Sequence, residues 1–84
     1  MYFDQFGSYE KVIQDTKAFR IEVVTSTSEV VRSSDMPSEV MGMVADAIDA
    51  CEETRTSFHV WDHTKRTVTI VPYASISSLR IVLL

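Results

Sequence analysis

Residues 37–53 read PSEVMGMVADAIDACEE, and this stretch decides how the rest of the chain is interpreted. Its apolar residues recur with the period of one helix face: Val40, Met41, Val44, Ala47, Ile48 and Cys51. Pro37 suits the first turn of a helix, because the N–H that proline lacks would be unpaired there. The stretch therefore predicts an amphipathic helix, and its apolar side needs another element to pack against.

The segments on both sides of this helix are predicted to be strands, and the first of them shows the period-2 alternation of a half-buried strand. The five predicted strands are 18–24, 29–32, 57–61, 67–71 and 76–84. Short polar connections predict two hairpins, the second closed by residues 62–66. Residues 8–16 fit either a short N-terminal helix or a first strand. We expect an α+β fold in which the main helix packs on one face of a mostly antiparallel sheet of about five strands, made of two hairpins plus a C-terminal strand.

The composition describes a single small globular domain that spans residues 1–84. The chain is 45% hydrophobic and 24% charged, and at this length folding buries only about 60 to 65% of the surface of the unfolded chain. Dimerisation would therefore add useful stability. No apolar run approaches the roughly 20 residues of a membrane span, and the first residues lack the regions of a signal peptide. We expect a cytoplasmic protein without a membrane partner, of the size typical of bacterial or phage accessory proteins.

Charge is unevenly distributed along the chain. The formal net charge is −4, yet residues 35–53 contain six acidic residues and no lysine or arginine. Four acids lie on the polar face of the predicted helix and form a candidate surface for a basic protein partner: Glu39, Asp46, Asp49 and Glu53. An acidic total disfavours non-specific binding of nucleic acid.

A second set of side chains is expected on the sheet face away from the helix. Alternation places Val68 and Ile70 toward the helix and five other apolar residues away from it, where they form a candidate oligomer interface: Val24, Trp61, Val71, Val82 and Leu84. Such a patch is larger than a monomer usually exposes. A second copy of the chain would cover it. The alternative is that the N-terminal segment with Tyr2, Phe3 and Phe6 folds over it within one chain.

The same face also suggests an alternative function, the binding of single-stranded nucleic acid. Aromatic rings would stack on bases, and basic side chains would neutralise phosphates. The candidate residues are Arg20, His59, Trp61, Lys65, Arg66 and Arg80.

Residues that could carry catalysis or bind a metal have simpler structural roles. Cys51 is the single cysteine and lies on the apolar helix face, so we expect a core residue. His59 lies in a strand and His63 in a turn, so their rings need not converge on a metal, and Asp62 is expected to bond amides of the turn. With two glycines, no phosphate loop is expected. The sequence thus predicts a non-catalytic protein–protein interaction module without cofactor, which self-associates as a dimer.

Overall fold

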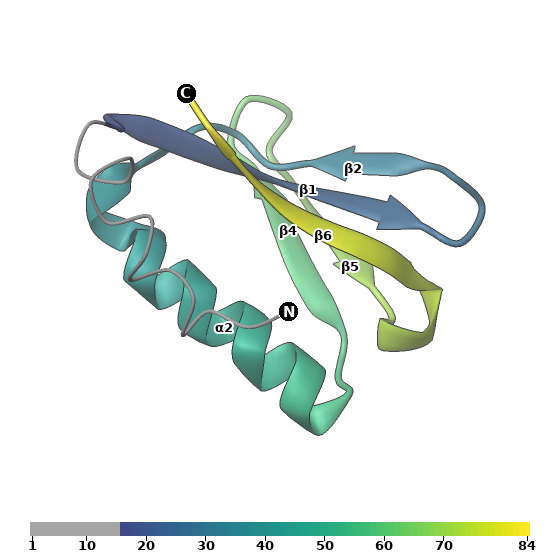
Figure 1. Ribbon diagram of the computed structural model, residues 1–84. Coiled ribbons are helices and arrows are strands. Elements are labelled where there is room, and N and C mark those ends of the chain that lie inside the picture. Colours follow the sequence, from purple (N-terminus) through teal and green to yellow (C-terminus); the bar gives the residue numbers. More distant parts are fainter. Residues whose placement is uncertain (1–15) are drawn as a thin grey trace.

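A computed structural model describes residues 16–84 (Figure 1). The strands are β1 (Ala18–Thr25), β2 (Val30–Arg32), β3 (Met36–Pro37), β4 (Phe58–Asp62), β5 (Thr67–Val71) and β6 (Ile76–Leu83). The main helix, α2 (Met41–Thr54), follows the 3-10 turn η2 (Ser38–Val40), and a second such turn, η3 (Tyr73–Ser75), precedes β6. The predicted α+β fold class is confirmed. The interpretation of residues 8–15 and the covering N-terminal segment concern residues outside those described.

β1 is the central strand of the larger sheet. It pairs with β2 and β3 along one edge and with β6 along the other, always antiparallel. We call these four strands the main sheet. The alternation of β1 turns Phe19, Ile21 and Val23 toward the interior, where each is buried.

β4 and β5 form a separate two-stranded antiparallel ribbon, the β4–β5 ribbon. Figure 1 shows this ribbon crossing behind β1 and β6. Ser34, just after β2, connects the two sheets: its N–H donates to the carbonyl of Trp61 at 3.0 Å, and its Oγ accepts from the N–H of His63 at 3.2 Å. The expected single sheet is therefore divided into two.

The core lies between the main sheet, the β4–β5 ribbon and α2. Its buried members are Phe19, Ile21, Val23, Met41, Ile48, Cys51, Phe58, Val60 and Val71. Burial raises the pKa of the Cys51 thiol, and the nearby Glu52 adds to the shift. The Cys51 Sγ donates to the carbonyl of Thr56 at 3.0 Å. Cys51 is a protonated core residue, in agreement with its expected role. Its hydrogen bond also fixes the segment that follows α2.

Candidate functional site

The two faces of β5 are the reverse of those expected. Asp62 still belongs to β4 and pairs with Thr67, so the hairpin loop has four residues, 63–66, rather than five. A one-residue change of register moves every side chain of a strand to the opposite face. Val71 is therefore buried, at 4% exposure, which corrects its expected place in the oligomer interface. Val68 and Ile70, expected toward the helix, point to solvent instead.

The side chain of Asp62 accounts for the shorter loop. Its Oδ1 accepts hydrogen bonds from the backbone N–H groups of Thr64 at 3.0 Å and of Lys65 at 3.2 Å, as predicted. Arg66 completes the turn with a positive φ of 55°. These contacts pair Asp62 with Thr67 and bring the next residues of the two strands into register.

The outward side of the β4–β5 ribbon consists mainly of apolar residues. Cross-strand partners share a face, so Trp61 lies beside Val68 and His59 beside Ile70. We call these four residues the exposed ribbon face. Trp61, Val68 and Ile70 have 57%, 41% and 59% of their surface exposed. The ring of His63 stacks on Trp61 with centroids 6.4 Å apart. Exposed apolar side chains that adjoin one another are typical of contact surfaces.

This face continues around β4 into a groove beside α2. The groove has a volume of about 440 Å³, and its lining includes His59 and Trp61 on one side and Met43 and Ala47 on the other. Met43 is itself highly exposed. The exposed ribbon face is thus one part of a longer apolar surface.

β5 is also an edge strand with unusual composition. Among residues 16–84 it pairs with β4 alone, so its other edge has no strand beside it. All five of its residues are β-branched: Thr67, Val68, Thr69, Ile70 and Val71. Natural edge strands are commonly protected by charges, prolines or bulges. β5 contains no charge or proline, and its pairing with β4 runs without a bulge.

The other residues of the expected interface lie on the main sheet. Val24 and Val82 are half-buried on its outer side, and Leu84 is exposed just beyond β6, where its N–H donates to the carbonyl of Ala18 at 3.0 Å. Trp61 is the one member on the ribbon's outer face. The expected patch is therefore divided between two sheets because the strands do not form one.

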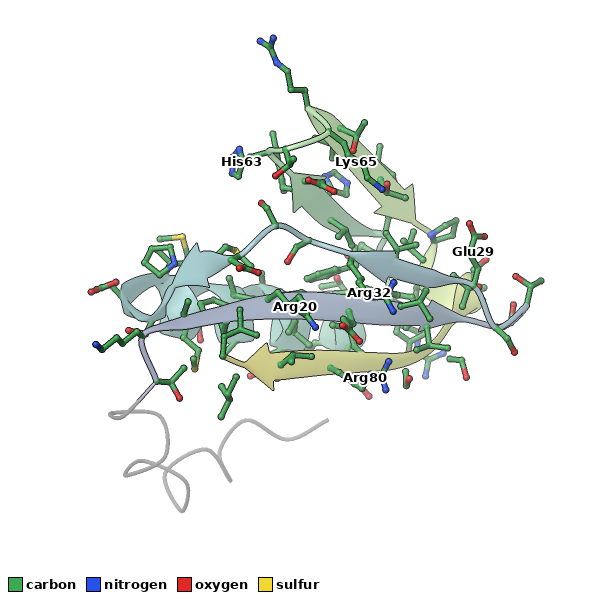
Figure 2. The ribbon with its side chains drawn as sticks, turned by 90° about the horizontal axis from the view of Figure 1, so that it is seen from above. Arg20, Glu29, Arg32, His63, Lys65 and Arg80 are labelled. Carbon is green, nitrogen blue, oxygen red and sulfur yellow. The ribbon has the colours of Figure 1, made fainter. Side chains whose placement is uncertain are left out.

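The candidate nucleic-acid residues are divided in the same way. His59, Trp61, Lys65 and Arg66 belong to the β4–β5 hairpin, whereas Arg20 and Arg80 lie on the main sheet. Figure 2 shows Lys65 and His63 at the hairpin and the arginines over β1, β2 and β6.

On the main sheet the arginines surround Glu22, which is only 7% exposed. Its Oε2 accepts from the Nε of Arg20 at 3.0 Å and of Arg32 at 3.3 Å, and its Oε1 accepts from Nη2 of Arg80 at 3.0 Å. The hydrogen bond from Arg20, with the charges of Arg32 and Arg80, holds the pKa of the Glu22 carboxyl below its ordinary value against the opposing effect of burial. Sequence reasoning missed Arg32, because its place beside Glu22 depends on the pairing of β1 with β2.

The four acids predicted on the polar helix face lie in η2 and α2, on the side toward solvent. Glu39, Asp46 and Glu53 are exposed and Asp49 is half-buried, and none of the four forms an ion pair within residues 16–84. A basic partner for this side stays a prediction. In the described part of the chain, no three metal-ligating side chains of His, Cys, Asp or Glu gather, and no helix is long and apolar enough to cross a membrane.

Comparison with known proteins adds no functional information. The chain matches no protein-family model, no curated protein and no solved structure. Functional conclusions therefore have to come from the residues themselves.

Proposed function

We propose that the protein is a non-catalytic interaction module that self-associates by pairing the β5 strands of two copies. The observation that carries the proposal is that Val68 and Ile70 are exposed on an edge strand with no protecting charge. An unpaired strand edge presents backbone donors and acceptors to a second strand, and apolar side chains favour their removal from water.

The sequence of β5 suits a copy of itself. A two-fold axis at Thr69 would place Thr69 opposite the same residue of the second copy in an antiparallel pair. Val68 would then face Ile70 of the second copy, and Ile70 would face its Val68. Both apolar residues that β5 contributes to the exposed ribbon face would meet an apolar partner, which stabilises cross-strand pairs.

Pairing would also relieve a weakness of the monomer. A two-stranded ribbon is marginal unless it packs on something, and the β4–β5 ribbon is covered by the core on its inner side only. Two joined ribbons make four strands and extend one apolar face across both copies. Because the core of the domain is small, dimerisation through this pairing would add to the stability of the folded state.

Sedimentation equilibrium of the wild type beside two matched variants tests the proposal. Ile70→Lys places a charge on the edge of β5, and Leu84→Lys places the same charge on an exposed apolar residue of the main sheet. We expect a dimeric wild type, a dimeric Leu84→Lys variant and a monomeric Ile70→Lys variant. A monomeric wild type at high concentration would refute self-association. Dissociation by Leu84→Lys alone would move the interface to the main sheet.

A further inference from the structure

The outer side of the main sheet carries more positive charge than its own carboxylate neutralises. Glu22 lies in β1, and strand pairing places Arg32 of β2 on one side of it and Arg80 of β6 on the other. Arg20 precedes it by two residues in β1, on the same face of the sheet. Figure 2 shows the three arginine side chains over neighbouring strands. Three cations around one anion leave an excess of two positive charges.

Within residues 16–84, most donors of these arginines have no hydrogen-bond partner and are open to a ligand. Each guanidinium has several N–H groups, and the structure shows one hydrogen bond from each to Glu22. Within residues 16–84 the three arginines form no other ion pair. Their side chains are 33%, 60% and 54% exposed for Arg20, Arg32 and Arg80, so the unused donors are accessible from solvent.

The arrangement has the chemistry of an oxyanion site. A guanidinium fork matches the oxygens of a phosphate group and can bind two of them at once. Glu22 accepts hydrogen bonds from the Nε atoms of Arg20 and Arg32 and so restricts these long side chains before a ligand binds. Binding then costs less conformational entropy, because fewer side-chain conformations are lost. A doubly charged phosphate would balance the two excess charges.

We propose that Arg20, Arg32 and Arg80 form a binding site for the phosphate group of a ligand on the outer face of the main sheet. Glu22 is the residue that positions the guanidinium groups. This site lies on β1, β2 and β6, whereas the proposed self-association uses β5. A test of one proposal therefore does not decide the other.

Isothermal titration calorimetry at low salt tests the site with two probes, pyrophosphate and an oligodeoxythymidylate. Arg32→Gln and Arg80→Gln should each weaken binding about tenfold, the amount typical of losing one charged hydrogen bond. Arg55→Gln is the matched control, because Arg55 is exposed just after α2 and forms no ion pair with any member of the cluster. It should leave the affinity unchanged.

The two probes distinguish the sources of the phosphate. Tight binding of pyrophosphate with a weak response to the oligonucleotide would assign a small phosphorylated ligand. Binding of the oligonucleotide with a steep salt dependence would assign a nucleic-acid backbone. Circular dichroism of each variant confirms that it is folded. Failure of the wild type to bind either probe, or an equal loss in the Arg55→Gln control, would overturn the proposal.

Discussion

β5 and β6 are both edge strands, but they are built in opposite ways. Among the described residues each pairs along one side only, β5 with β4 and β6 with β1. β6 has Arg80 in its middle, and its register with β1 shifts at Ser77, which leaves a bulge. β5 has neither device and consists of five β-branched residues. Charge and bulge are common ways of keeping an edge from pairing.

The comparison teaches which edge of the molecule is available. Arg80 is tied to Glu22, so the charge that protects β6 is also part of the ion-pair cluster of the main sheet. In the described part of the chain, the outer face of the β4–β5 ribbon has no such cluster and exposes Trp61, Val68 and Ile70 to solvent. The outer side of the main sheet therefore carries an ion-pair cluster, whereas the outer side of the β4–β5 ribbon is mainly apolar.

The largest expected effect separates the inner face of the ribbon from its outer face. Phe58 is buried and lies beside Val71, and Phe58→Ala should lower the free energy of unfolding by about 3–5 kcal/mol. Ile70→Ala, on the outer face, should change the stability of the monomer by no more than about 0.5 kcal/mol. Urea unfolding at low protein concentration measures both. Similar losses in the two variants would contradict the assignment of the faces.

The next prediction concerns the carboxylate that organises the outer side of the main sheet. The pKa of Glu22 lies below its ordinary value of 4.5 in the folded protein. Its ion pairs therefore stabilise the fold fully above about pH 4.5 and are lost as pH falls through the lowered pKa. Glu22→Gln should melt at a lower temperature than the wild type at pH 7, and the difference should shrink as pH falls. A difference independent of pH would show that the carboxylate charge is not what stabilises the sheet.

Removing the charge that protects β6 should create a second strand edge that can pair with another copy of the chain. Arg80→Val leaves an uninterrupted apolar run at the end of β6, and a molecule with two unlike open edges can form chains longer than a dimer. Light scattering should show species larger than a dimer. Arg20→Val is the control, because Arg20 lies on the central strand β1 and its loss removes an equivalent contact with Glu22 without altering an edge strand. Equal growth in both variants would assign the effect to a weakened ion-pair cluster.

The smallest expected effect is an increase in stability far from both edges. Gly42 lies in α2, is exposed, and a Cβ built on it would meet no atom within 4 Å. Close approach of another backbone is therefore not the reason for this glycine. Gly42→Ala should stabilise the protein by about 0.5–1 kcal/mol and leave self-association unchanged. A loss of stability in urea unfolding would contradict this reading of the helix.

Most elements were predictable from the sequence because their patterns are strong. The helix shows a clear 3.6-residue pattern, and strands such as β1 and β5 alternate. The short strand β3 was not predicted, and Pro37, expected in the first turn of the helix, ends β3 instead, so that α2 begins at Met41 after η2. The faces of β5 were not predictable, because they depend on whether Asp62 ends β4 or begins the turn. A single side chain that bonds two amides decides this.

Contacts between distant segments explain the remaining differences. The division into two sheets depends on Ser33 and Ser34, which bond to β1 and β4 respectively. The cluster around Glu22 requires the register of β1 with both β2 and β6. Local patterns contain no information on either, since a strand's alternation shows which side a residue takes and not which residue stands beside it.

Oxidative cross-linking of Thr69→Cys tests the pairing of β5 most directly. Directly opposed residues of an antiparallel pair lie about 4.5–5.5 Å apart at Cα, within the range that a disulfide spans. A two-fold axis at Thr69 predicts a covalent dimer for Thr69→Cys and none for Thr67→Cys, whose counterpart in the second copy lies opposite Val71. The native Cys51 is buried and serves as the unreactive background. Equal cross-linking of both variants, or of neither, would contradict the proposed pairing.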